Sequence, residues 1–185
     1  MKFKLNIIAA VAAAVALTST VQAVPITGNI GFSGVATLNS GSAGTATQVT
    51  TWGTNNVFSV SAGSALALFV TLGDQVTLHS PWTFNSPAIN SFWTVDGFTF
   101  NLSNSSIFSN SGGFLAVVLA GTVVGHGYDA TAFTGSFQLA DPSADGQTQF
   151  TTRLSFTPVP DGGSTVLLLG AALSGLALIK RKLVA

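Results

Sequence analysis

The stretch Phe133-Thr134-Gly135-Ser136-Phe137-Gln138-Leu139 decides the fold class, because its large apolar and its polar side chains fall on opposite sides of an extended chain. A period of two residues is typical of a β-strand with one buried face. The segments 98–102 and 150–156 alternate in the same way, with Arg153 on the outward side of the second. These three strands predict an all-β fold.

The rest of the chain between the two termini consists of short apolar or alternating runs separated by Gly, Ser and Asn. Further strands are predicted at residues 26–32, 34–38, 45–52, 57–61, 66–72, 75–79, 92–95 and 114–124. The runs 66–70 and 114–120 are apolar on both faces, which suits the centre of a sheet. Residues 39–44 and 101–113 are predicted to be loops or edge hairpins. Regularly spaced short strands favour a β-sandwich or a sheet closed on itself, and we expect a β-sandwich-like single domain over residues 24–158.

The charge of this predicted domain excludes one class of partner. It holds one cation, Arg153, against five aspartates and no glutamate, a formal net charge of −4. A surface this poor in Lys and Arg cannot neutralise a phosphate backbone, so we expect no nucleic-acid binding. The chain has no cysteine, which excludes disulfides, thiolate nucleophiles and zinc–thiolate sites. We expect no cofactor and no metal.

The amino terminus has the pattern of a secretory signal peptide over residues 1–23. Lys2 and Lys4 precede an apolar run at 7–17, and small or short apolar residues stand at positions −3 and −1 of the bond between Ala23 and Val24. An N-terminal membrane anchor is the alternative, but the run is too short to span a bilayer comfortably. We therefore expect a signal helix that signal peptidase removes after Ala23.

The carboxyl terminus, residues 159–185, has three parts. A short motif at 159–165 is followed by an apolar run at 166–179 and by three cations at 180–182. A helix of that length is about 21 Å long, short of the hydrocarbon core of about 30 Å, although flanking residues can make up part of the difference. A core helix is the alternative, but the run is apolar on all faces. We expect a weak transmembrane helix with its basic end in the cytoplasm.

The motif, the weak helix and the basic end together resemble the PEP-CTERM class of sorting tails, and more closely its VPDSG-CTERM variant. The matching residues are Val159, Pro160, Asp161 and Gly163. Gly162 stands where that variant usually has Ser. The resemblance covers about the last 27 residues and implies recognition and cleavage near the motif by an exosortase, a membrane-embedded transpeptidase-like enzyme.

The proline and glycines of the motif also have a physical interpretation. Pro160 fixes its own φ and biases Val159 towards extended geometry, and the glycines add slack beside the membrane. An accessible, extended segment is what a membrane-embedded processing enzyme needs to bind. A plain juxtamembrane linker is the alternative.

Two polar segments suggest chemistry, and each has a structural alternative that we favour. Residues 125–129 hold His, Tyr and Asp, which do acid–base work or bind metals in other proteins, but two glycines indicate a turn after a long apolar strand. Residues 141–146 hold two aspartates and a glycine, but their spacing differs from that of a calcium loop. We expect a turn at each and no catalytic site, and so no enzyme.

Trp82 and Trp93 are the candidate sugar contacts, because flat apolar rings can stack on sugar faces. Core packing is the alternative for both. The function we expect is an exported structural protein of the envelope or extracellular matrix, with a carbohydrate-binding module in the exopolysaccharide as the alternative. The expected partners are the secretion machinery, signal peptidase, the exosortase and, transiently, the inner membrane. The expected final location is the cell surface or the extracellular matrix.

Overall fold

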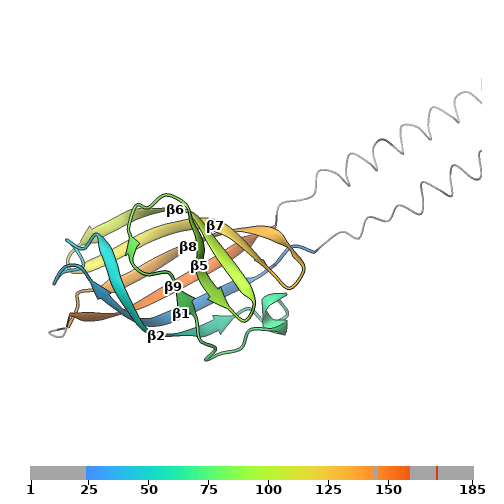
Figure 1. Cartoon of the computed structure of the whole chain (residues 1–185), viewed down its shortest axis with the longest axis horizontal. Helices are drawn as coiled ribbons and strands as arrows, with labels where there is room; N and C mark the ends of the chain where they lie inside the picture. Colours follow the sequence, from blue (N-terminus) through green and yellow to red (C-terminus); the bar gives the residue numbers. More distant parts are fainter. Residues whose placement is uncertain (1–23, 144–145, 159–169, 171–185) are drawn as a thin grey trace, which may run out of the picture.

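The computed structural model describes residues 24–143, 146–158 and 170, and nine strands make up most of the described chain (Figure 1). The strands are β1 (Asn29–Leu38), β2 (Gln48–Val60), β3 (Thr77–Leu78), β4 (Trp82–Thr83), β5 (Ile89–Val95), β6 (Phe98–Ser111), β7 (Phe114–Gly125), β8 (Tyr128–Ala140) and β9 (Gln147–Thr157). One short 3-10 helix, η1 (Leu66–Leu68), lies between β2 and β3. The prediction of an all-β domain is confirmed.

All nine strands belong to one antiparallel sheet in the order β3-β5-β6-β7-β8-β9-β1-β2-β4. The sheet curls until its two edges meet (Figure 1). The chain just before β3 joins them, because Val57 of β2 donates its N–H to Asp74 O at 2.9 Å while Leu78 of β3 pairs with Trp93 of β5. The two facing layers are thus halves of a single sheet, which encloses a sandwich-like core.

Glycine-containing two-residue turns explain how β5 to β8 follow one another so closely. The connections are Asp96-Gly97, Gly112-Gly113 and His126-Gly127, and both residues of each have positive φ. Turns with two positive φ values match the right-handed twist of the flanking strands, and glycine adopts this geometry without steric cost. These turns stack β5 to β8 edge to edge as a continuous antiparallel meander.

Aromatic rings fill the enclosed core. Phe32 packs edge-on against Phe100 with ring centroids 5.8 Å apart, and Trp82 packs the same way against Phe137 at 5.0 Å. Edge-to-face pairs like these add to the free energy gained by removing the rings from water. The predicted alternation is confirmed in β6, β8 and β9, where Phe98, Phe100, Leu102, Phe133, Phe137, Leu139, Phe150, Leu154 and Phe156 are all buried.

The prediction of a strand at 66–72 is wrong. Leu66 begins the 3-10 helix and is buried, whereas Leu68 and Leu72 are 74% and 67% exposed. Local side-chain hydrogen bonds hold the turn, since Ser64 Oγ accepts from Ala67 N at 3.2 Å. Such bonds offer the backbone an alternative to a sheet ladder, and apolar composition alone does not reveal them.

The prediction of a loop or edge hairpin at 101–113 is wrong for most of its length. Strand β6 continues to Ser111 and pairs with β7 along the whole segment, and only Gly112 and Gly113 form the turn. The Ser- and Asn-rich sequence has low β propensity, but cross-strand pairing with an apolar neighbour overrides it. The prediction of a loop at 39–44 is confirmed, because β1 ends at Leu38 and β2 begins at Gln48.

The predicted signal helix at 1–23 and transmembrane helix at 166–179 lie outside the described residues, apart from Gly170. Within the described part of the chain, no helix has the length and apolar character needed to cross a membrane.

Candidate functional site

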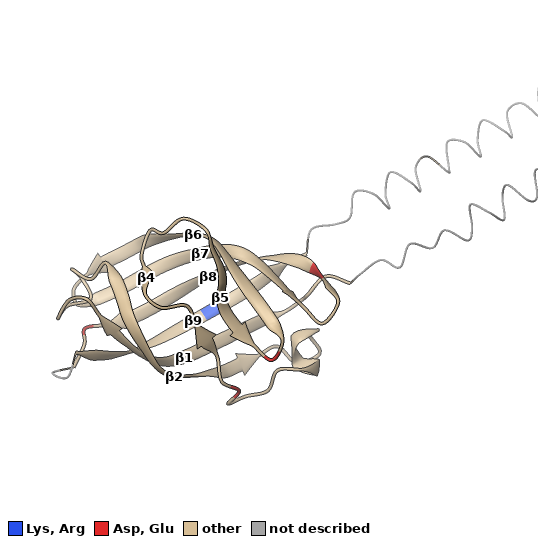
Figure 2. Cartoon of the chain, in the orientation of Figure 1, with Lys and Arg blue, Asp and Glu red and all other residues tan. Residues whose placement is uncertain are grey.

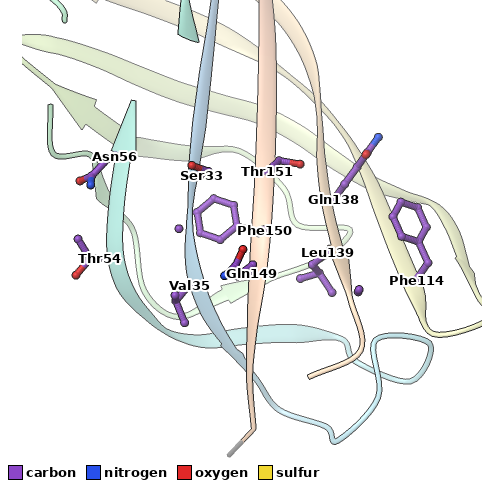
Figure 3. Close-up of a pocket in the computed structure, with 12 residues that line it drawn as sticks. Ser33, Val35, Thr54, Asn56, Phe114, Gln138, Leu139, Gln149, Phe150 and Thr151 are labelled. Atoms are coloured by element: carbon purple, nitrogen blue, oxygen red, sulfur yellow. The ribbon is translucent and has the colours of Figure 1, made fainter. Parts of the chain in front are cut away.

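A groove of about 510 Å³ on the outer face of the sheet is the candidate binding site. Strand register lines up one row of polar side chains along it, because Ser33 pairs with Asn56 and with Thr151, and Thr151 pairs with Gln138. Figure 3 shows Ser33, Thr151 and Gln138 one after another across neighbouring strands. Directly opposed residues in a sheet point to the same face, so the row is continuous over β2, β1, β9 and β8.

A second row borders the groove and is more apolar. Val35 pairs with Gln149, and Phe114 of β7 pairs with Ala140 of β8. The ring of Phe114 is 40% exposed, while Gln149 and Ala140 are also exposed. Amide and hydroxyl groups therefore lie beside an accessible ring and a half-buried Val35. This combination can donate and accept hydrogen bonds and also contact apolar C–H surface.

The groove is electrically neutral and continues beyond this region. None of its twelve lining residues is charged. A second hollow of about 440 Å³ shares Val35, Ala140 and Gln149 with it and extends to Asp141. Arg153 follows Thr151 by two positions on the same face of β9 and is the only Lys or Arg in the described part of the chain (Figure 2). Its guanidinium lies 5.4 Å from the centre of the Phe58 ring.

The polar segment 125–129 forms the β7–β8 turn, as predicted. His126 has φ of 51° in the turn, and its Nε2 lies 2.6 Å from Asp96 O in the neighbouring β5–β6 turn. The His126 ring stacks on Phe69 with centroids 3.8 Å apart. The histidine thus links two turns and the loop that carries η1 at the end of the sheet where β1 begins and β9 ends.

A pair of carboxyl groups lies at the same end. The backbone N–H of Thr71 donates to Asp74 and is the main cause that lowers the pKa of that carboxyl. The hydrogen bond between the side chains of Asp74 and Asp96 raises the pKa of Asp96, with burial and the neighbouring negative charge acting in the same direction. The shared hydrogen bond and the neighbouring charge therefore make Asp96 harder to ionise than Asp74.

The prediction of sugar contacts at Trp82 and Trp93 is wrong. Their exposed fractions are 0% and 1%, and both rings pack among core phenylalanines. A ring without an exposed face cannot stack on a sugar. The sequence around each Trp does not show whether its ring points to the core or to solvent. The register of the strand determines that direction.

In the segment 141–146, for which we expect a turn, Asp141 makes structural hydrogen bonds. Its Oδ1 accepts hydrogen bonds from Ala43 N at 2.7 Å and Ser42 Oγ at 3.0 Å, which fastens the β1–β2 loop to the end of β8. Asp145 lies outside the described residues. In residues 24–143 and 146–158, no three His, Cys, Asp or Glu side chains are placed to hold a metal ion.

Sequence reasoning missed the groove residues. Thr151 and Gln138 were visible as the outward members of alternating strands, but nothing local indicated that they stand side by side. The signal that could find them is strand register, which a single sequence specifies weakly on a polar face. Of the predicted processing residues, Val24 is 61% exposed, whereas Ala23 and the motif at 159–163 lie outside the described residues.

Comparison with known proteins bears on the tail. A family model described as the VPDSG-CTERM motif matches residues 158–183, and the match begins one residue after β9 ends at Thr157. No curated protein and no solved structure matches the chain. The motif marks exported proteins that are sorted through their carboxyl terminus. The tail, which follows directly on the last strand, therefore matches the VPDSG-CTERM sorting motif over residues 158–183.

Proposed function

We propose that this chain is an exported, non-enzymatic structural protein of the cell surface or extracellular matrix. In this proposal the signal peptide is removed after Ala23, the tail holds the chain in the inner membrane, and an exosortase cuts near Pro160 and Asp161. The single observation that carries the proposal is the family match at 158–183, immediately behind the last strand. That placement leaves a complete β domain on one side of the expected cut and a disposable tail on the other.

The composition of the domain supports a passive role. Its polar outer face is built from Thr, Ser, Asn and Gln, and Arg153 is the one Lys or Arg between residues 24 and 158. Neutral polar side chains hydrate well and form no ion pairs with a partner. A curled sheet whose edges are joined also presents little free strand edge, which protects it from edge-to-edge aggregation when it is crowded in a matrix.

The test is fractionation of a host that makes both an exosortase and an exopolysaccharide and expresses the full chain. We expect wild type at the surface or in the medium, and Pro160→Ala/Asp161→Ala at full length in the membrane fraction. Pro142→Ala/Asp145→Ala is the matched control, because it changes the same residue types between β8 and β9 and leaves the hydrogen bonds of Asp141 intact. Equal release of the motif variant and wild type would refute processing at the motif.

A neutral polysaccharide ligand is the second candidate function, and the groove favours it. The row Ser33, Thr151 and Gln138 supplies amide and hydroxyl groups in register, which can pair with sugar hydroxyls. The Oδ1 of Asn56, at the end of this row, is buried. The exposed ring of Phe114 offers a surface for sugar C–H groups. The two connected hollows give an elongated site, as a polymer requires.

Affinity electrophoresis of the chain through gels containing dextran, with alginate as a charged comparison, tests this second function. We expect dextran to retard wild type and Gln138→Ala/Gln149→Ala to lose most of the retardation. Thr134→Ala/Ser155→Ala is the matched control, since these exposed residues pair on the outer face of β8 and β9 but lie outside the groove. Equal retardation of both variants would exclude the groove as the binding site.

A further inference from the structure

Exposed apolar side chains gather at the end of the domain where β1 begins and β9 ends. Leu68, Phe69 and Leu72 are 74%, 42% and 67% exposed, and we call them the apolar tip. Val24, which is 61% exposed, lies at the same end and carries the α-ammonium group after the proposed cleavage. Asp129 N donates to Val24 O at 3.2 Å, and the ring of Phe69 lies 6.4 Å from that of Tyr128, so both lie beside the start of β8. Figure 1 shows the segment between β2 and β3 at the end of the sheet where β1 begins and β9 ends.

The loop that carries the tip is held by its own contacts. Leu66 and Val70 are 0% and 1% exposed, so they anchor the loop in the core on either side of Leu68 and Phe69. Val70 N also donates to Leu66 O at 2.8 Å. An apolar side chain that is held in water by a well-bonded loop gains free energy when another apolar phase covers it.

The length of chain beyond the domain identifies what covers the tip. Seven residues separate Pro158 from the apolar run that begins at Val166. An extended segment of that length reaches about 25 Å at most, so a tail in the bilayer keeps this end of the domain near the membrane surface. The tether also raises the local concentration of the tip at that surface, so that weak contacts are sufficient to hold it there.

We propose that the apolar tip inserts shallowly into the outer leaflet of the membrane while the tail still anchors the chain. The inference rests on the proposed anchoring of the tail. Leu68 and Leu72 supply the apolar surface. Zwitterionic lipid is the partner, because Asp74, Asp96 and Asp129 lie at this end with no Lys or Arg among the described residues there, and the α-ammonium group of Val24 offsets only one of these three charges. Loss of the tail removes the tether, so the same contacts become too weak to retain the released domain.

The chain has no cysteine, so a single cysteine can report the depth of one side chain. Leu68→Cys, Leu72→Cys and Phe108→Cys, each labelled with a fluorophore, are reconstituted as chains of residues 24–185 into phosphatidylcholine vesicles that contain nitroxide-labelled lipid, because the apolar run at 7–17 could otherwise bind the vesicles by itself. Phe108 is the matched control, because it is 79% exposed but lies ten residues along β6, about 30 Å from the tip. We expect several-fold stronger quenching at 68 and 72 than at 108.

The outcomes separate this inference from the anchoring on which it rests. A chain that does not float with the vesicles overturns both the anchoring and the docking. A chain that floats, but is quenched equally at all three positions, overturns the docking alone. Energy transfer between labelled copies without lipid quenching assigns the tip to a second copy of the chain instead and also overturns it. Stronger quenching after phosphatidylglycerol replaces half of the lipid would contradict the zwitterionic partner.

Discussion

Replacing Thr152 by valine is expected to stabilise the domain, although it changes a residue in the centre of the core. Thr152 lies on the inward face of β9, is 1% exposed, and pairs with Phe32 on one side and Phe137 on the other. Its Oγ1 is buried and has no hydrogen-bond partner among the described residues. A buried hydroxyl without a partner costs about 1–3 kcal/mol.

Valine has nearly the shape of threonine, so Thr152→Val removes the unpaired hydroxyl without opening a cavity. We expect the free energy of unfolding to rise by about 1–2 kcal/mol and the melting temperature by about 3–8 °C. Urea unfolding of a chain that contains residues 24–158, followed by tryptophan fluorescence, measures the change. The three Trp residues all pack with core rings, so their emission reports core exposure directly.

Thr148→Val is the matched control on the same strand and face. Thr148 is 6% exposed, and its Oγ1 donates to Ala140 O at 2.8 Å, so valine removes a bond that the structure contains. We expect a loss of about 1 kcal/mol. Destabilisation of both variants by similar amounts would refute the reasoning, because it would mean that the Thr152 hydroxyl is also satisfied.

Three further predictions concern the core, the backbone and the carboxyl pair. Trp82→Ala should lower the free energy of unfolding by about 3–5 kcal/mol in urea titration, because the side chain is 0% exposed and leaves a cavity; a loss below 1 kcal/mol would contradict its place in the core. Gly135→Ala should break the β8–β9 ladder locally, because a Cβ there would lie 2.2 Å from Arg153 O; amide exchange of β9 that stays at the wild-type rate would argue against that contact. Because the pKa of Asp96 is raised in the folded state, protonation of Asp96 stabilises the fold at pH values below its ordinary pKa of 3.8. This stabilisation is lost as the pH rises through the raised pKa. The lowered pKa of Asp74 acts oppositely, with stability lost as pH falls through it. The urea concentration at the unfolding midpoint should therefore fall above pH 3.8 in wild type, and Asp96→Asn should abolish this fall. A variant with the same pH profile as wild type would show that the Asp74–Asp96 pair does not cause it.

Alternation predicted the strands whose buried face is rich in phenylalanine, because burial on one side imposes a period of two. Thr152 shows how strict the pattern is, since it takes the inward position that the period assigns although it is polar. Alternation carries no information on which strands pair. The joining of the sheet edges depends on the short segment before β3, and there the chain has too few residues for a period to be visible.

The tail could be recognised from sequence, since a short motif, an apolar run and a basic end have a fixed order along the chain. The groove could not, because Ser33, Gln138 and Thr151 are far apart in sequence and meet only through register. For Trp82 and Trp93, by contrast, the sequence led to a predicted surface site that the structure does not contain. Their aromatic character suggested a surface role, but burial of large rings releases more free energy than any single polar contact, and both lie in the core.

The intact mass of the protein recovered from the surface or medium of an exosortase-containing host tests the central claim most directly. We predict a single species that begins at Val24 and ends between Pro158 and Gly163, so that it retains every strand and lacks the apolar run at 166–179. A released species that retains residues 166–185 would contradict the account, as would a cut inside β9.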